Sequence, residues 1–327
     1  MERSWMVVLV LVGCVHPEGA PLGDDMPAPD AEVPDGAPPP DPARPVLPAT
    51  PPDPADNPRT PAKVALGRQL FFDPILSGDR TTSCATCHRP ELAFTDGRPT
   101  PPGVARNSMT VLNTAWNGLV DATPPDPAQA PMFWDNRTRS LEAQAKGPLT
   151  SAAEMMGTHY TAQTIFPELV ARLSASPDYT AKFDAAFGGS SITEDNIARA
   201  IAAYERTLVT PQTSFDRGQL SPLAQAGGQI FDAIGCTNCH SGPMFSDWKL
   251  HRLRGELIRT PSLRHVTRTA PYMHDGSLAT LPNVFQFYRQ ATENPVDPDL
   301  RGVRTPTPQE APAVEAFLAA LGDSAPP

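Results

Sequence analysis

Two copies of one short pattern constrain this chain more than any other feature of its 327 residues. The segments Cys84-Ala85-Thr86-Cys87-His88 and Cys236-Thr237-Asn238-Cys239-His240 each place a histidine directly after a pair of cysteines. This is the attachment pattern of c-type haem, in which both thiols form thioethers with haem vinyl groups and the imidazole binds the iron. We therefore expect two covalently bound c-type haems. The predicted attachment residues and proximal ligands are Cys84, Cys87, Cys236, Cys239, His88 and His240.

Paired cysteines also occur in three other kinds of site. Two such pairs could bind zinc, form disulfides in an exported protein or act as thioredoxin-like redox pairs. None of these sites requires a histidine directly after both pairs. Cys14 is the only other cysteine in the sequence. We therefore favour haem attachment over all three.

The first residues indicate export. Residues 5–12 form an apolar run that is too short to stay in a bilayer as a stable helix. Residues 11–14, Leu-Val-Gly-Cys, resemble the lipobox of bacterial lipoproteins, where cleavage before the cysteine precedes its lipidation. We predict a lipoprotein-type signal peptide at 1–13, a lipid anchor at Cys14 and a location on the periplasmic side of a bacterial membrane. Val15 in place of an aspartate favours the outer membrane, and an ordinary secretory signal with an incidental cysteine is the alternative.

Residues 14–60 are expected to form a disordered, lipid-anchored tether. Residues 15–60 are rich in proline and contain nine acidic side chains against two basic ones. With few aliphatic side chains to bury, such a segment cannot offset the entropy lost on ordering. It holds most of the chain's net charge of −10, so the rest is close to neutral. The basic surface of a nucleic-acid-binding protein is therefore not expected.

Helix patterns dominate from residue 62 onward, and alternating strand patterns are scarce. Residues 193–208 follow a threonine N-cap and repeat apolar side chains on one face. Residues 222–234 begin with proline after Ser221. Residues 307–321 begin with a Thr-Pro-Gln-Glu capping box and end before Gly322. The sequence therefore predicts a mainly α fold with long connecting loops.

A helical segment precedes each cysteine motif, at residues 64–72 and 221–235. The motifs are 152 residues apart, which leaves room for a domain of cytochrome c size around each one. We predict two related cytochrome c-like domains, at 61–213 and 214–327, each with one covalently bound c-type haem.

Motifs spread over residues 62–327 resemble those of the bacterial di-haem cytochrome c peroxidase family, which includes MauG. In the N-terminal half they are 70–74 (Leu-Phe-Phe-Asp-Pro), 93–98 (Ala-Phe-Thr-Asp-Gly-Arg), 133–137 (Phe-Trp-Asp-Asn-Arg) and 142–149 (Glu-Ala-Gln-Ala-Lys-Gly-Pro-Leu). In the C-terminal half they are 215–217 (Phe-Asp-Arg), 260–264 (Thr-Pro-Ser-Leu-Arg) and 270–277 (Ala-Pro-Tyr-Met-His-Asp-Gly-Ser). The resemblance implies a di-haem enzyme that uses hydrogen peroxide.

The resemblance places peroxide binding at the haem held by His88. It implies that Glu154 transfers the peroxide proton as general base and then acid, and that Gln144 and Pro148 line the same pocket. Trp134 corresponds to an electron relay between the haems. From the residues alone, Glu154 would be a solvated surface carboxylate and Trp134 a core aromatic, so both roles depend on the resemblance.

A calcium site between the domains is also implied. Its protein ligands would be Asn107 and the backbone carbonyls of Thr269 and Pro271, which are oxygen donors of the kind that Ca²⁺ prefers. His274 would lie near the second haem and the calcium waters without binding iron.

The sequence differs from many family members in the loop that is expected to lie near the first haem iron. Those members have a histidine in the loop just before the position of Arg106, and it caps the iron at rest. Residues 99–105, Pro-Thr-Pro-Pro-Gly-Val-Ala, contain no histidine. We therefore expect the N-terminal iron to be open on its distal side in every redox state.

The sequence also differs from the family peroxidases at the expected sixth ligand of the second haem iron. At the position that corresponds to Tyr288, counted 17 residues after Pro271, the family peroxidases have methionine and MauG-like members have tyrosine. An anionic phenolate favours oxidised iron and lowers its potential. The alternative is that Tyr288 packs as a core aromatic and that Met273 or Met244 binds the iron.

The expected activity is reduction of hydrogen peroxide with electrons from a small cytochrome c or cupredoxin, passed through the C-terminal haem. One alternative, favoured by the two departures, is a MauG-like enzyme that uses peroxide to oxidise side chains of a partner protein, such as tryptophan. The other is a di-haem electron carrier without catalysis. The segment between Ser246 and Arg259 is shorter than in many relatives and is a candidate for the partner surface or for contacts between the domains.

Overall fold

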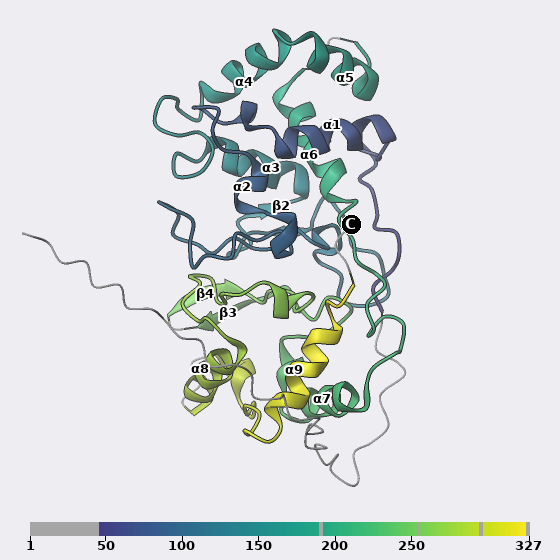
Figure 1. The fold of residues 1–327 in the computed structure, drawn as a ribbon, viewed down its shortest axis with the longest axis vertical. Helices are drawn as coiled ribbons and strands as arrows, with labels where there is room; N and C mark the ends of the chain where they lie inside the picture. The colour runs from purple at the N-terminus through teal and green to yellow at the C-terminus, as the bar shows by residue number, and fades with distance from the viewer. Residues whose placement is uncertain (1–45, 190–191, 254, 294–296, 325–327) are drawn as a thin grey trace, which may run out of the picture. The chain divides into compact units, whose positions relative to one another are not determined.

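Helices make up most of the regular structure in this computed structural model, which describes residues 46–189, 192–253, 255–293 and 297–324. The predicted signal peptide, Cys14 and most of the tether lie outside these ranges. In chain order the helices are α1 (Pro61–Phe72), α2 (Cys84–Cys87), α3 (Leu141–Thr150), α4 (Ile165–Ser174), α5 (Pro177–Phe187), α6 (Glu194–Glu205), α7 (Pro222–Ala233), α8 (Leu281–Glu293) and α9 (Ala311–Ala320) (Figure 1). The prediction of a mainly α fold is confirmed.

The strands form two short antiparallel pairs. In the first, β1 (Pro131–Met132) pairs with β2 (Thr138–Arg139). In the second, β3 (Leu250–Leu253) pairs with β4 (Glu256–Arg259), and His251 lies opposite Ile258. The segment that the sequence marked as short is therefore a hairpin.

Helix starts follow the capping signals in the sequence. Thr193 accepts a hydrogen bond from the backbone of Asn196 at the start of α6, and Ser221 does the same for α7. Before α9 the Thr307 amide donates to the Glu310 carboxylate at 2.8 Å, and the Glu310 amide donates to the Thr307 hydroxyl at 3.3 Å. The predicted capping box is thus formed, although the regular helix begins at Ala311 and not at Thr307.

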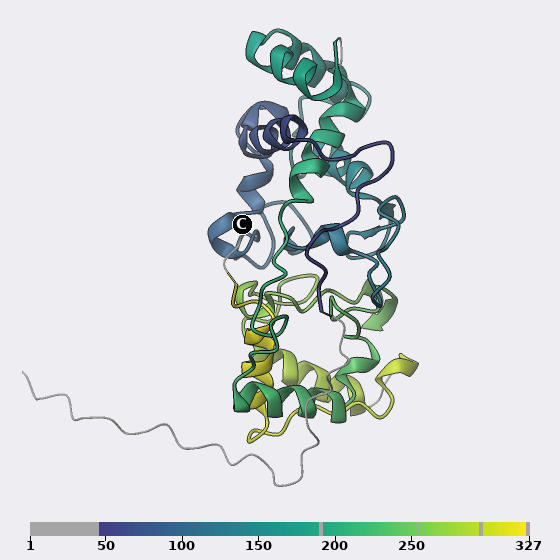
Figure 2. The same cartoon turned by 90° about the vertical axis from the view of Figure 1, so that its right-hand side faces the viewer.

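The N-terminal and C-terminal halves are built on the same plan. A helix that precedes the cysteine motif packs against the last helix of its half, α1 on α6 and α7 on α9 (Figure 2). Each crossing has a glycine at its centre: a Cβ on Gly67 would lie 1.8 Å from the Ala200 carbonyl oxygen, and one on Gly227 would lie 1.8 Å from that of Ala313. Only a residue without a side chain allows the backbones to approach this closely.

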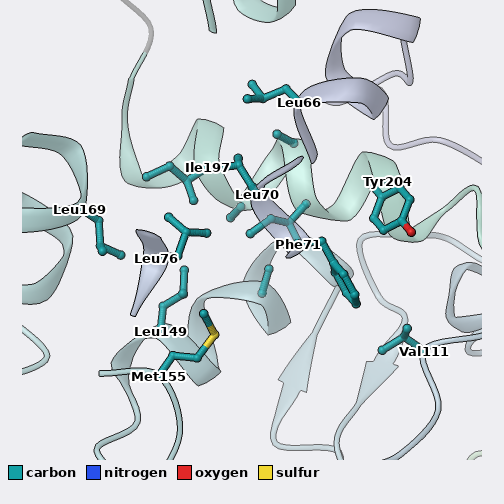
Figure 3. Packing of buried hydrophobic residues seen from close by; sticks show 14 of the residues in the cluster. Leu66, Leu70, Phe71, Leu76, Val111, Leu149, Met155, Leu169, Ile197 and Tyr204 are labelled. Carbon is teal, nitrogen blue, oxygen red and sulfur yellow. The ribbon is translucent and has the colours of Figure 1, made fainter. Parts of the chain in front are cut away.

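Hydrophobic clusters divide in the same way. The larger one joins side chains between Leu66 and Leu208, and Figure 3 shows Leu66 and Phe71 of α1 among side chains of α6. A second cluster joins side chains between Phe215 and Leu321. The gap between these clusters lies at the predicted domain boundary after residue 213. A third cluster bridges both halves and contains Leu47, Trp116, Leu119, Met244 and Trp248.

Residues 46–60 correct the predicted extent of the tether, because they pack on the folded body. The Leu47 side chain is buried, and its amide donates to Asp216 at 3.1 Å. Asn57 is also buried and donates to the Glu142 carboxylate at 2.8 Å. Arg59 forms an ion pair with Asp53 at 2.7 Å. These contacts offset the entropy of ordering, so residues 46–60 belong to the folded body and not to the predicted tether.

Candidate active site

Both cysteine motifs open onto one cavity of about 870 Å³. Apart from Cys84, every site residue predicted within the described part of the chain contributes to its wall. These residues are Cys87, His88, Asn107, Trp134, Gln144, Pro148, Glu154, Cys236, Cys239, His240, Thr269, Pro271, His274 and Tyr288. The fold therefore gathers at one cavity residues that are up to 201 positions apart in the sequence, from Cys87 to Tyr288.

The first motif forms the short helix α2, and its histidine is oriented by the backbone. His88 Nδ1 lies 3.1 Å from the carbonyl oxygen of Phe94. A carbonyl only accepts, so Nδ1 carries the proton and Nε2 keeps the lone pair that an iron needs. Burial lowers the pKa of His88, which favours the same neutral form. Phe94 adopts a left-handed conformation with φ of 57°, which belongs to the turn that presents this carbonyl.

The second motif repeats the arrangement. His240 Nδ1 lies 3.0 Å from the carbonyl oxygen of Phe245, which is also left-handed with φ of 52°. Burial lowers the pKa of His240 as well. Two imidazoles with the same tautomer therefore present Nε2 as an iron ligand in both halves.

The cysteines fit haem attachment better than they fit disulfides or redox pairs. All four are free thiols, so the disulfide alternative is not formed. Burial raises the pKa of Cys84 and Cys236 to about 12, whereas redox pairs depend on thiols with a lowered pKa. Free thiols and neutral histidines around one large cavity are what two covalently bound haems require.

Helix α3 forms the wall of the cavity that carries Gln144 and Pro148. These residues are one helical turn apart and face the cavity, whereas Ala145 and Leu149 face the hydrophobic core. The Pro148 carbonyl accepts hydrogen bonds from Ser151 at 3.3 Å and Met155 at 3.1 Å. This turn carries Glu154, which lines the cavity and interacts electrostatically with Cys87.

No histidine is available opposite His88 among the residues that the structure describes. The loop expected to lack one contributes Pro101, Gly103, Val104 and Ala105 to the cavity wall. The other cavity-lining histidines are His240, His251 and His274. His240 belongs to the second motif, and the other two face carboxylates: His251 those of Asp247 and Asp297, and His274 that of Glu256.

Trp134 lies where the two halves meet. Its indole Nε1 donates to the Asn107 carbonyl at 3.0 Å, and its own carbonyl accepts from the Arg259 amide at 2.7 Å. The Asn107 amide donates in turn to the His274 carbonyl at 2.8 Å. Trp134 lines the cavity and belongs to none of the hydrophobic clusters, in contrast to an ordinary core aromatic.

Helix α8 presents Tyr288 to the second motif. Leu281, Val284, Phe285 and Tyr288 share the face of α8 that lines the cavity. Burial raises the pKa of Tyr288, and the next contributions come from Cys239 and Cys236, so the hydroxyl lies beside the second motif. Both alternative ligands, Met273 and Met244, also line the cavity, and Met244 packs in the cluster with Leu47 and Trp116 as well.

Two charged residues at the cavity were missed from the sequence. Glu205, at the end of α6, is 5% exposed, and burial raises its pKa to about 8. Arg259, at the end of β4, is 3% exposed. The signal for Glu205 was available, since it lies one helical turn after Ile201 on the apolar face of the predicted helix. Arg259 had no such signal.

His251 was missed too. Its ring lies 3.0 Å from the Asp247 carboxylate and 3.3 Å from that of Asp297. The hydrogen bond to Asp247, followed by contacts with Cys239 and Asp297, raises the pKa of His251 to about 11. The imidazolium therefore connects the hairpin to the second motif and to the turn that follows α8.

Known proteins share these features. The family model described as di-haem cytochrome c peroxidase matches residues 61–221. Methylamine utilization protein MauG of Methylorubrum extorquens is 36% identical over 270 residues, which span 72% of this chain and 71% of that protein. Cytochrome c551 peroxidase of Nitrosomonas europaea is 31% identical over 258 residues, which span 68% of this chain and 72% of that protein.

Solved structures agree with the sequence relatives. A crystal structure of a MauG-like protein associated with microbial copper homeostasis superposes with a TM-score of 0.70 at 29% identity. The match covers 84% of this chain and 94% of that protein. The resemblance inferred from the motifs is thus confirmed, and the chain belongs to the di-haem cytochrome c peroxidase family, whose members are oxidoreductases that carry two c-type haems.

Proposed function

We propose that this chain reduces hydrogen peroxide to water at the haem held by His88, with electrons that enter through the haem held by His240. When bound, the haems supply the redox chemistry, and each peroxide takes up two electrons and two protons to form two waters. The observation that carries the proposal is that Glu154 and Gln144 line the same cavity as His88, and that the loop 99–105 at this cavity has no histidine to cap the iron.

The chain's own residues would manage the protons. Glu154 can accept the peroxide proton and return it to the departing oxygen, as a general base and then acid. The turn anchored by the Pro148 carbonyl holds Glu154 at the cavity. Gln144 supplies an amide that can orient peroxide, and Pro148 has no backbone N–H to compete for it.

Trp134 would serve as the electron relay between the two halves. Its indole donates to the Asn107 carbonyl, and its backbone carbonyl accepts from the Arg259 amide of β4, so the residue links a segment of the N-terminal half to β4 of the C-terminal half. The electron donor would be a small cytochrome c or cupredoxin. His240 and Tyr288 would be the residues that bind the second haem.

The first test is an optical and EPR spectrum of the ferric holoprotein before and after one equivalent of hydrogen peroxide. We expect a mixture of high-spin and low-spin haem and a rapid reaction with peroxide. Two low-spin haems that do not react would rule out the open site and leave the chain as an electron carrier.

Tyr288 favours a second candidate, in which peroxide is used to oxidise side chains of a partner protein, as the MauG likeness suggests. A phenolate ligand lowers the haem potential and makes electron uptake from a high-potential carrier less favourable. Steady-state turnover with a reduced donor cytochrome separates the two. Fast turnover supports the peroxidase, whereas slow turnover with peroxide-dependent mass changes in a co-expressed partner supports protein oxidation.

We also propose a calcium site at the junction between the halves. The Asn107 side-chain amide donates to the carbonyls of Arg98 at 2.9 Å and Pro99 at 3.2 Å, which leaves its oxygen as an acceptor. Thr269 and Pro271 line the same cavity and would add backbone carbonyls. Removal of Ca²⁺ by a chelator should change the haem spectra, and Mg²⁺ should not restore them. Metal analysis without bound calcium would contradict the site.

The proposed location is the periplasmic side of the outer membrane, with a lipid on Cys14. Haem attachment to both motifs outside the cytoplasm is consistent with this location. None of the described helices is long and apolar enough to cross a membrane. Mass spectrometry of the mature N-terminus tests the anchor, and an unmodified Cys14 would contradict it.

A further inference from the structure

Arg259 is a buried cation without a close anion among the described residues. Its Nε donates to the Phe133 carbonyl at 2.9 Å, and its Nη2 lies 3.5 Å from the sulfur of Met109. Its guanidinium lies 5.2 Å from the centre of the Trp248 ring. These partners are dipoles or π faces, and none of them carries a negative charge.

The carboxylate that acts electrostatically on Arg259 is already neutralised. Burial lowers the pKa of Arg259 to about 10, and Asp135 is the acidic group that opposes this shift. The Asp135 carboxylate lies 2.9 Å from the Arg137 guanidinium, which forms an ion pair with it. Arg259 therefore stays protonated at neutral pH and carries a charge that the surrounding side chains do not balance.

Other buried arginines of this chain each have a carboxylate. Arg206 lies 2.6 Å from Glu142, and Arg264 lies 2.8 Å from Asp216. An isolated buried charge is strongly unfavourable, so proteins pair such charges. By this comparison, Arg259 lacks an anion that the polypeptide does not supply.

The position of Arg259 limits what this anion can be. Arg259 lines the shared cavity. Nη2 of Arg259 contacts Met109, whose backbone interacts with His88. Two residues after Arg259, the backbone of Pro261 interacts with His240. The guanidinium thus lies between the two proximal histidines, where a group bound in either haem space is within reach.

We propose that Arg259 binds the propionate of a haem at the boundary between the two haem spaces. A haem carries carboxylates, and a guanidinium pairs with a carboxylate through two parallel hydrogen bonds. The pair keeps the propionate ionised in a buried place and holds a fixed positive charge beside the electron path. A positive charge favours the reduced iron, which carries one positive charge fewer, so Arg259 raises the haem midpoint potential.

The test is a spectroelectrochemical titration of both haems in the holoprotein, between pH 5.5 and 8.5. Arg259→Gln should lower the midpoint potential of at least one haem and make it pH-dependent, because the unpaired propionate then takes up a proton on reduction. Arg259→Lys keeps the charge and should fall between wild type and Arg259→Gln. Lys182→Gln removes an exposed charge that is already paired with Asp178 and lies outside the cavity wall, so it should match wild type. Potentials of Arg259→Gln that overlay the wild-type values at every pH would overturn the proposal.

A solvent anion is the competing occupant, and the salt distinguishes it. If chloride binds Arg259, wild-type potentials will change when chloride replaces sulfate at constant ionic strength, and the propionate assignment will be wrong. If a propionate binds, they will not change. If Arg259→Gln does not fold with haem, resonance Raman spectra of wild type and Arg259→Lys still test whether a propionate binds Arg259. The propionate bending band should shift in Arg259→Lys, and an unshifted band would overturn the proposal.

Discussion

The backbone of the turn that follows α3 holds Glu154 in position. Its amide donates to the Ser151 carbonyl at 3.1 Å, and the buried side chains of Met155 and Met156 fix the turn to the core. The carboxylate is left free to face the cavity. A substitution that keeps the shape of this side chain should therefore alter proton transfer without altering the fold.

We expect Glu154→Gln to slow the reaction with peroxide by roughly 10²–10⁴-fold, because an amide cannot accept and return the proton. Stopped-flow mixing of the ferric protein with hydrogen peroxide measures this rate. Glu91→Gln, on the surface near the first motif, should react like wild type. An unchanged rate in Glu154→Gln would remove this residue from the mechanism.

Tyr288→Phe tests the second haem. Loss of the hydroxyl should change the optical and EPR spectra of this haem and raise its potential, since an anionic ligand stabilises oxidised iron. Tyr272→Phe is the matched control, because Tyr272 lines the same cavity and burial likewise raises its pKa. If Tyr288→Phe keeps the wild-type spectrum and Met273→Leu does not, methionine is the ligand.

At the residue scale, the sequence predicted what lies close together along the chain. His88 follows its cysteines directly, so its role could be inferred from five residues. Arg259 and His251 could not be inferred in this way. The partner of Arg259 is Phe133, 126 residues away. His251 has Asp247 four residues before it, but its other partner, Asp297, is 46 residues away and is brought close only by the fold.

Among the structural elements, the helix crossings place both haem motifs. In each half the helix before the motif meets the last helix at a glycine, and neither crossing leaves space for a Cβ. Gly67 and Gly227 therefore fix the distance between the helices that support Cys84 and Cys236. A larger residue at either position must push the helices apart.

We expect Gly227→Ala to destabilise the protein by about 1–3 kcal/mol, as overpacking of a tight interface commonly does, despite the higher helix propensity of alanine. Guanidinium unfolding of the holoprotein measures the loss. Gly189→Ala is the control, since a Cβ there would meet nothing within 4 Å. A Gly227→Ala variant as stable as wild type would show that α7 and α9 can separate without loss.

Element boundaries were predictable where the signal is local. The N-caps Thr193 and Ser221 and the Thr307 capping box depend on side chains within three residues of the backbone groups that they bind. Residues 46–60 were misassigned for the opposite reason. Their composition indicates disorder, but Leu47 and Asn57 bind residues 169 and 85 positions away.

On the scale of the whole molecule, buried charges determine how stability depends on pH. Glu310, bound by Arg304, has its pKa lowered to about 2, so its contribution is lost as the pH falls from 4.5 towards 2. The hydrogen bond to Asp247 raises the pKa of His251 above its ordinary value of 6.5, so the contribution of His251 is complete below pH 6.5 and declines as the pH rises above it. From these two groups alone, stability should be greatest between about pH 4.5 and 6.5.

Glu205 should add to the decline on the alkaline side. Its folded-state pKa of about 8 lies above the ordinary value of 4.5, so the folded chain keeps this proton between pH 4.5 and 8 while the unfolded chain releases it. Unfolding therefore becomes easier as the pH rises through this range. Glu205→Gln removes the proton equilibrium and should be more stable than wild type by roughly 3 kcal/mol at pH 7.

The free energy of unfolding in guanidinium, measured for wild type and Glu205→Gln at several pH values, tests this dependence. The difference should be small at pH 4.5 and should grow up to pH 8, because only the wild-type carboxyl must stay protonated to remain buried. Glu293→Gln, at the exposed end of α8, should follow the wild-type curve throughout. A difference that does not change with pH would mean that Glu205 is ionised in the folded protein and is paired with a cation at the cavity.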